Sequence, residues 1–132
     1  MNFNALPTVS FTPTPDSFPF ESKQLSLADK VRVQLGCEFD VAPSPSNGIF
    51  PKGPLSLSTP HAEVWIQGKQ ILVRDRSSVH GTYVNGIRIQ QQTLLQDGDL
   101  VTLGQQLSRS SASNTPDCQL KPIEASVTIV GV

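Results

Sequence analysis

The chain has 132 residues, 37% of them hydrophobic, with 10 basic and 11 acidic side chains and a formal net charge of −1. This length fits one domain with a single core. The near-balance of charge excludes a general attraction to nucleic acid or acidic membranes. The N-terminus lacks the basic and apolar runs of a signal peptide.

The cysteine content points to a reducing compartment. Cys37 and Cys118 are the two cysteines, whereas a small secreted domain normally holds more of them at closer spacing. No stretch approaches the roughly 20 apolar residues that span a bilayer. We therefore expect an intracellular, cytoplasmic protein that does not insert into a membrane and that reaches an organelle surface only through other proteins.

The N-terminal segment is rich in proline. Because proline fixes φ and removes a backbone donor, we expect no helix and no central strand there. The interpretation is an extended or disordered arm over residues 1–22, ahead of a domain over residues 23–132. Phe18 and Phe20 are expected to dock on that domain. The prolines of the arm are Pro7, Pro13, Pro15 and Pro19.

From residue 30 onward the pattern indicates short β-strands separated by turns. The pair Asn85-Gly86 is typical of a tight hairpin turn, and residues 97–99 and 67–70 also suit turns. No segment longer than a turn or two has helical periodicity, so we predict an all-β sandwich of two antiparallel, twisted sheets. The expected strands cover residues 31–35, 63–66, 71–74, 83–84, 87–89, 100–103 and 125–130, with long loops over 42–60 and 105–117.

The most informative stretch runs from Ser58 to Gly104. This stretch resembles the forkhead-associated (FHA) domain, and the resemblance covers about residues 23–132. The residues Asn47-Gly48-Ile49-Phe50 and His61-Ala62-Glu63-Val64-Trp65 look closest to the FHA domains of the sarcolemmal membrane-associated protein and of fungal vacuole-targeting and pheromone-arrest proteins. The motif reads Ser58-Thr59-Pro60-His61-Ala62, Asp75-Arg76-Ser77-Ser78-Val79-His80-Gly81-Thr82-Tyr83-Val84-Asn85-Gly86, then Asp97-Gly98-Asp99 and Leu103-Gly104.

The resemblance implies a protein-interaction module that binds a phosphothreonine peptide across the loops at one end of the sandwich. Such a site must hold a group with about −1.5 to −2 charges and three acceptor oxygens. Arginine suits that group because its planar fork donates two parallel bonds. The expected partner is a phosphorylated protein segment, with no nucleic acid, no cofactor and no metal.

Carried over position by position, the phosphate chemistry of the family is incomplete. The main arginine of the family falls on Cys37, the hydroxyl donor on Ser58, and the asparagine that holds the peptide backbone on His80. The resemblance assigns phosphopeptide binding to Cys37, Ser58, Thr59, Ser78, Val79 and His80. It assigns structural motif positions to Gly36, His61, Gly81, Thr82, Asn85 and Gly86.

The missing guanidinium is expected to weaken phosphate binding. Loss of one member of a charge-assisted pair costs about 2–5 kcal/mol, so a roughly micromolar site would fall to about 0.2 mM. Arg76, Lys52 and Arg32 are candidate surrogate cations. His80 is either a further partial replacement, since histidine can carry charge in mild acid, or a loop residue that contributes no charge.

Two readings of the function stay open, and a third is set aside. The first is phosphopeptide recognition through Ser58, Thr59 and His80 with a surrogate cation. The second is a degenerate FHA scaffold that binds a partner independently of phosphorylation. An enzyme using Cys37 is not predicted, because the sequence shows no paired nucleophile and base and no metal-ligand spacing. Ser58 can also be a simple loop cap, and His61 is expected to be a buttress rather than a contact.

Overall fold

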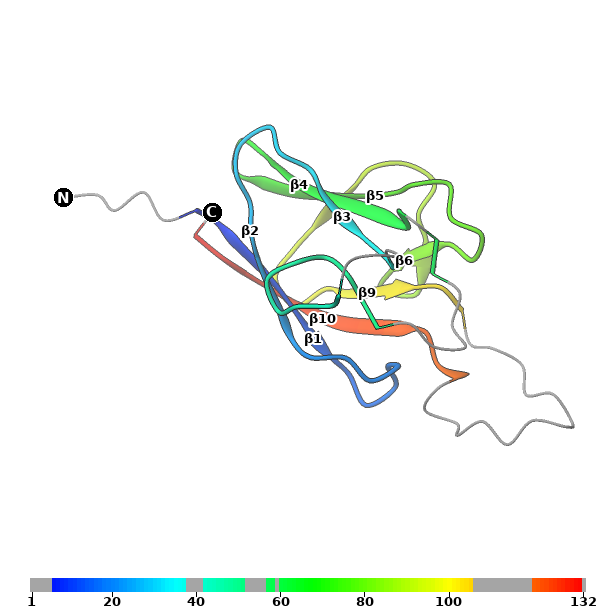
Figure 1. Cartoon of the computed structure of the whole chain (residues 1–132). Coiled ribbons are helices and arrows are strands. Elements are labelled where there is room, and N and C mark those ends of the chain that lie inside the picture. Colours follow the sequence, from blue (N-terminus) through cyan, green and yellow to red (C-terminus); the bar gives the residue numbers. More distant parts are fainter. Residues whose placement is uncertain (1–5, 38–41, 52–56, 59, 106–119, 132) are drawn as a thin grey trace, which may run out of the picture.

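The computed structural model describes residues 6–37, 42–51, 57–58, 60–105 and 120–131. In this part of the chain two sheets of antiparallel strands lie face to face, and there is no α-helix (Figure 1). The predicted all-β sandwich is confirmed. Both long loops fall partly outside the described residues, as do Lys52, Thr59 and Cys118.

The larger sheet has six strands in the order β2-β1-β10-β9-β6-β7. The first and the last strand of the chain are neighbours within this sheet, because β1 pairs with β10 over six residues. Figure 1 shows this pair running side by side below the smaller sheet. The strands are β1 (Thr8–Pro13), β2 (Lys23–Ser26), β6 (Thr82–Val84), β7 (Ile87–Arg88), β9 (Leu100–Leu103) and β10 (Ile123–Val130).

The smaller sheet has four strands in the order β3-β4-β5-β8. A hairpin forms its centre, with Gln67 opposite Gln70 at the turn and Ala62 opposite Asp75 at the other end. This hairpin is the one that the sequence predicts over residues 63–74. The strands are β3 (Val33–Leu35), β4 (Ala62–Gln67), β5 (Gln70–Asp75) and β8 (Thr93–Leu95).

The prediction that residues 1–22 hold no central strand is wrong. β1 lies between β2 and β10 and bonds to both. Pro7 precedes the strand and Pro13 ends it, so the residues between them keep their backbone donors, while Val9 and Phe11 point into the core. The expected docking of Phe18 and Phe20 is confirmed: Phe18 is buried, and Phe20 packs edge-on against Phe50 with ring centroids 5.1 Å apart.

The core follows from the two-residue period of the strands. On β4, Ala62, Val64 and Ile66 face the larger sheet, whereas Glu63 and Trp65 point to the outer face. Alternate residues of the long strands in the larger sheet pack against these side chains. The fully enclosed aliphatic and aromatic side chains include Val9, Phe11, Leu25, Leu27, Leu35, Phe50, Ile71, Leu103 and Ile123.

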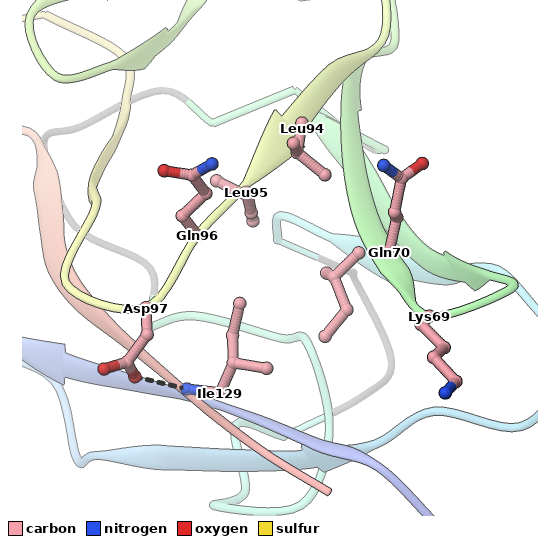
Figure 2. A pocket seen from close by; sticks show the side chains of 8 residues that line it. Lys69, Gln70, Leu94, Leu95, Gln96, Asp97 and Ile129 are labelled. Carbon is pink, nitrogen blue, oxygen red and sulfur yellow. Dashed lines mark hydrogen bonds between the residues drawn. The ribbon is translucent and has the colours of Figure 1, made fainter. Parts of the chain in front are cut away.

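The two ends of the sandwich differ. At the hairpin-turn end, a cleft of about 320 Å³ opens between β5, β8 and β10, with an apolar wall of Ile71, Leu95 and Ile129 (Figure 2). The Asp97 carboxylate closes one side by accepting the Ile129 N–H at 2.8 Å. The opposite end carries the loops around residues 58 and 76–81, where the sequence places the motif.

Phe11→Ala tests whether β1 is part of the core. The side chain is 1% exposed, so we expect a loss of about 3–5 kcal/mol from the free energy of unfolding in urea. Thr12→Ala, on the exposed side of the same strand, is the matched control and should change stability by less than about 0.5 kcal/mol. Equal stability of the two variants would contradict the packing of β1.

Candidate functional site

A buried histidine joins the two loops at the motif end. The His61 side chain is fully enclosed; its Nε2 lies 2.7 Å from the Gly81 carbonyl oxygen, and its Nδ1 lies 3.1 Å from the Ser58 backbone nitrogen. Since a carbonyl can only accept and a backbone N–H can only donate, Nε2 carries the proton and the ring is neutral. Burial is the largest cause that lowers the pKa of His61, and the neighbouring His80 acts in the same direction. The hydrogen bond to Gly81 and the charge of Asp75 raise the pKa, but they do not outweigh the burial.

The Ser58 hydroxyl lies at the surface of this junction. Its oxygen accepts the Val79 backbone N–H at 3.1 Å, and no acceptor for its own proton occurs among the described residues. The side chain is partly exposed, so its O–H can donate to a ligand. A Cβ on Gly36 would lie 2.6 Å from the Ser58 carbonyl oxygen, so the absence of a side chain there lets the two backbones approach.

Asp75 braces the 76–81 loop from below. Its carboxylate accepts the hydroxyl protons of Ser78 and Thr82, the latter at 2.7 Å, and the Ser78 N–H at 3.0 Å. Burial raises the pKa of Asp75, but these donated hydrogen bonds outweigh it and the pKa is lowered. Sequence reasoning did not select Asp75, although an aspartate followed by serines in a loop is a residue type that commonly bonds a nearby backbone N–H.

Ser78 and Thr82 therefore support the loop. Ser78 is buried, gives its proton to Asp75 and accepts the Gly81 N–H at 2.9 Å. Thr82 is fully buried. Ser78, which the resemblance placed among the peptide contacts, thus has no donor left for a phosphate, and we assign it a bracing role.

Three backbone positions hold the remaining motif geometry. Gly81 has φ 89°, and its carbonyl also accepts the Gly104 N–H at 2.9 Å. Asn85 and Gly86 have φ 52° and 83° between β6 and β7, the left-handed pair that the hairpin prediction requires. The Asn85 amide also donates to Asp99 at 3.1 Å and accepts the Leu100 N–H at 2.9 Å.

Cys37 lies where the resemblance expects the main phosphate-binding arginine. Its side chain is 9% exposed, and Sγ lies 3.6 Å and 3.8 Å from the carbonyl oxygens of Phe50 and Pro51. Gly36 anchors the same segment through bonds to Gly48 and Phe50. The thiol therefore points toward residues 50–51 and donates weakly to their carbonyl oxygens.

Val79 and His80 form the outer tip of the 76–81 loop. The Val79 side chain is 75% exposed, while its N–H is held by Ser58. His80 is half-buried, and its carbonyl accepts the Tyr83 hydroxyl at 3.2 Å. The loop end therefore brings Ser58, Val79 and His80 together over the buried His61.

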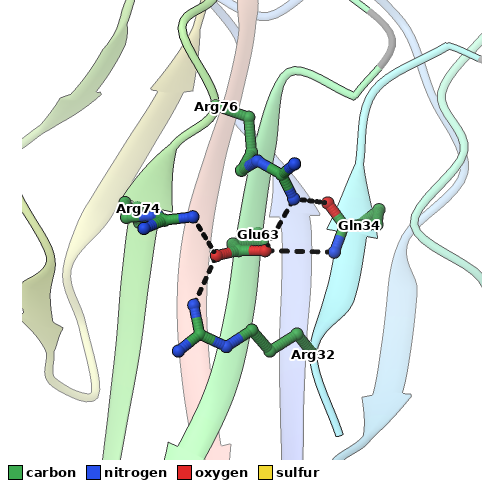
Figure 3. A network of polar contacts seen from close by, with 5 residues as sticks. All are labelled: Arg32, Gln34, Glu63, Arg74 and Arg76. Atoms are coloured by element: carbon green, nitrogen blue, oxygen red, sulfur yellow. Dashed lines mark hydrogen bonds and ion pairs between the residues drawn. The ribbon is translucent and has the colours of Figure 1, made fainter.

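The two described surrogate cations, Arg32 and Arg76, lie on the outer face of the smaller sheet and bind Glu63 (Figure 3). Arg32 Nη1 is 2.6 Å from Glu63 Oε1, and Arg76 Nη1 is 3.0 Å from Oε2. Arg74 adds a contact of 3.0 Å to Oε1, and Gln34 donates to Oε2 at 3.1 Å. This group of five residues is called the Glu63 network below.

Glu63 is the buried centre of that network. Its side chain is 2% exposed, and each carboxylate oxygen accepts from two donors. Burial raises the pKa of Glu63, but the hydrogen bonds from Gln34, Arg32 and Arg76 and the charge of Arg74 outweigh it, so the pKa is lowered. Glu63 therefore stays ionised and holds the arginines to the sheet.

Two further observations bound the chemistry of the described residues. Within them, no group of three or more His, Cys, Asp and Glu side chains is arranged to hold a metal ion. No helix in this part of the chain has the length and apolar character that crossing a membrane requires.

Comparison with known proteins agrees with the fold. The sequence model of the FHA domain matches residues 33–104. The protein C3H7.13 of Schizosaccharomyces pombe is 31% identical over 103 residues, which cover 70% of this chain and 34% of that protein. The chain thus spans about a third of the length of this relative.

Solved structures share the architecture at low identity. The yeast Dun1 FHA domain, solved with a doubly phosphorylated peptide derived from Rad53, matches with TM-score 0.55 and 18% identity over 100% of this chain and 79% of that one. The yeast Pml1 splicing factor matches with TM-score 0.61 and 16% identity over 100% and 86%. A structure from a study of phosphothreonine-dependent FHA interactions matches with TM-score 0.57 and 21% identity over 95% and 99%.

The neutral His61 ring predicts a loss of stability in mild acid. Its pKa in the fold is lowered from the usual 6.5, so below pH 6.5 the unfolded chain takes up a proton that the folded chain does not. We expect the neutral His61 ring to make its full contribution to the free energy of unfolding above pH 6.5. This free energy should fall as the pH drops toward the lowered pKa, as measured by urea unfolding between pH 7.5 and 5. His80→Gln removes only the smallest cause of the lowered pKa and should keep most of this slope, whereas His61→Gln should flatten it. The same slope in all three proteins would contradict the assignment.

Glu63→Gln tests the buried network. Removal of the charge leaves three guanidinium groups without their counterion, so we expect a loss of about 3 kcal/mol from the free energy of unfolding at pH 7. Because the Glu63 pKa lies below its usual 4.5, the stabilisation is complete above that pH and the difference should shrink as the pH falls further. Glu21→Gln, at an exposed carboxylate, is the control; a difference that stays constant down to pH 2.5 would refute the ionic explanation.

Proposed function

Because this chain belongs to the FHA domain family, we propose that it binds a phosphothreonine segment of a partner protein with the loop end that carries Ser58 and His80, at reduced affinity. FHA domains are modules of phosphothreonine-dependent protein interaction. The sandwich provides a rigid scaffold, and the side chains at one end of it provide the groups that bind the peptide.

The observation that carries the proposal is the placement of the Ser58 hydroxyl. His61 holds the Ser58 backbone, and the Val79 N–H occupies the acceptor side of the hydroxyl, so the O–H proton points to a role as donor. A hydroxyl fixed in this way can bond a phosphate oxygen without a loss of rotamer freedom at the moment of binding. His80, next to Val79, adds a ring that can become a second donor or a cation.

The reduced affinity follows from the cations. Cys37 supplies no guanidinium where the family uses arginine, and Glu63 holds the guanidinium groups of Arg32 and Arg76 on the outer face of the smaller sheet, not over Ser58. A phosphate with one fewer guanidinium loses about 3 kcal/mol, which corresponds to a Kd of roughly 0.2 mM from a micromolar reference. Such a module works in a cell only when a second contact or several copies raise the effective concentration.

A second candidate function is docking on a partner without phosphate. The observation in its favour is the apolar Val79 side chain, which is 75% exposed at the outer tip of the 76–81 loop. An exposed aliphatic group beside a weakened anion site suits an unmodified peptide better than a dianion. The two candidates differ in whether the phosphate group itself raises affinity.

The test is a titration of phosphothreonine peptides and their unmodified counterparts, selected from a phosphothreonine peptide library, by isothermal calorimetry. For the natural sequence we expect a Kd of roughly 0.2 mM that requires the phosphate. Ser58→Ala should weaken it about tenfold, as expected for a hydrogen bond to a charged group, while Ser58→Thr should preserve it. Cys37→Arg should tighten it about tenfold or more, because it restores a guanidinium.

The controls separate charge from packing. Cys37→Ser has nearly the same volume as the natural residue and should give no gain. Equal affinity for phosphorylated and unmodified peptides would favour the second candidate. Phosphate-dependent binding that survives Ser58→Ala unchanged would move the site away from this loop end.

A further inference from the structure

We propose that the outer face of β3, β4 and β5 is a second docking surface, which binds an acidic segment of a partner protein through Arg32, Arg74 and Arg76. This surface is distinct from the loop end and does not depend on the function proposed for it. Figure 3 shows the three arginines converging on Glu63, Arg74 from β5 and Arg32 and Arg76 from the residues that flank β3 and β5.

The charge of this face is opposite to that of the chain. Three guanidinium groups surround one carboxylate, which leaves a net charge of +2, whereas the whole chain has a net charge of −1. The Asp75 carboxylate, although next to Arg74 and Arg76 in sequence, is used by Ser78 and Thr82 on the loop side. The positive charge is therefore concentrated on one side of the sheet.

Most guanidinium donors in this cluster remain available. A carboxylate has about four acceptor positions, and Glu63 uses them on Arg32, Arg74, Arg76 and Gln34. Each guanidinium carries five N–H donors, and the three arginine side chains are 38–45% exposed. Arg76 Nη1 also donates to Gln34 Oε1 at 3.2 Å, but these contacts use fewer than half of the donors. An external carboxylate that reaches the exposed part of one arginine can accept two N–H bonds at once.

The arginines are also held in place before a ligand arrives. Glu63 is 2% exposed and fixed within β4, so it anchors all three guanidinium groups at their inner edge. The Arg32 guanidinium in addition lies 4.1 Å from the centre of the buried Trp65 ring. Ordering an exposed side chain costs about 0.5–1.5 kcal/mol on binding, and here part of that cost is already met by folding.

A hollow next to Arg32 extends the surface. It has a volume of about 360 Å³ and lies over Trp65 at the hairpin-turn side of the arginines. Asp29 and Lys30 at its rim offset each other in charge, and Trp65 gives the hollow an apolar part. An acidic peptide that crosses the arginines therefore has room to seat one neighbouring side chain here.

An acidic protein segment fits this surface better than nucleic acid does. Nucleic-acid binding draws on cations spread along a phosphate backbone and on an overall positive field, and this chain has a net charge of −1 with the three cations gathered around one residue. Paired guanidinium forks over β-strands suit closely spaced carboxylates.

The experiment uses a labelled Glu-Gly repeat peptide, a Gln-Gly repeat of the same length, and the whole chain. We expect the acidic peptide alone to bind, with an affinity that falls at least fivefold between about 50 and 300 mM salt because exposed charges are screened. Amide NMR shifts should move on β3, β4 and β5 and at Arg76, and not at residues 78–81 on the far side of the loop. Arg74→Gln should weaken binding about fivefold or more, and Arg74→Lys should retain most of it.

Matched variants exclude general charge effects. Lys121→Gln removes the same charge on the larger sheet, next to Pro15, and should leave binding unchanged, as should Ser58→Ala. Thermal unfolding confirms that Arg74→Gln is folded. Equal binding of the Gln-Gly peptide, equal losses in Arg74→Gln and Lys121→Gln, or a single-stranded oligonucleotide of equal charge that binds more tightly than the acidic peptide would each overturn the proposal.

Discussion

The contact between His61 and the Gly81 carbonyl is the constraint on which the loop end depends. It ties the segment before β4 to the segment before β6, two parts of the chain that belong to different sheets. The same ring fixes the Ser58 backbone, and the Ser58 hydroxyl in turn fixes Val79. A ligand at this end therefore meets a surface whose parts cannot move independently. A second proton on His61 would sit on Nδ1, so it would break the contact with the Ser58 N–H and leave the contact with the Gly81 carbonyl in place.

The β4–β5 hairpin separates two kinds of chemistry by strand alternation. Asp75 follows the side of β5 that carries Ile71 and Val73, and it reaches the loop residues Ser78 and Thr82. Arg74 and Arg76 point to the other face and meet Glu63. A shift of one residue in register would exchange these roles, so the same pairing that builds the core also positions the loop brace and the charged face.

Local sequence patterns predicted the parts of the fold that depend on local geometry. The Asn85-Gly86 turn and the β4–β5 hairpin required only nearest neighbours, and the motif from Ser58 to Gly104 identified the loop end. The position of β1 could not be predicted in this way, because its partner Val127 lies 116 residues from Phe11 and the prolines obscure the alternation. The Glu63 network was missed for a related reason: the run Glu63-Val64-Trp65 reads as a two-sided apolar strand, and only the pairing with β3 and β5 brings cations to the carboxylate.

The same distribution of charge explains why the two surfaces should be independent. At position 37 a thiol packs against residues 50–51 where the family uses arginine, so the proposed phosphopeptide binding would rest on the fixed Ser58 hydroxyl and on shape more than on charge. On the sheet face, the buried Glu63 carboxylate neutralises one of the three arginine charges and leaves a net charge of +2. Burial of that carboxylate has a desolvation cost. If only stability mattered, one arginine and Gln34 would satisfy much of that carboxylate. The second and third arginines are better explained by a partner that approaches from outside the sheet, and a weak loop-end contact combined with such a partner gives a selective interaction that neither surface provides alone.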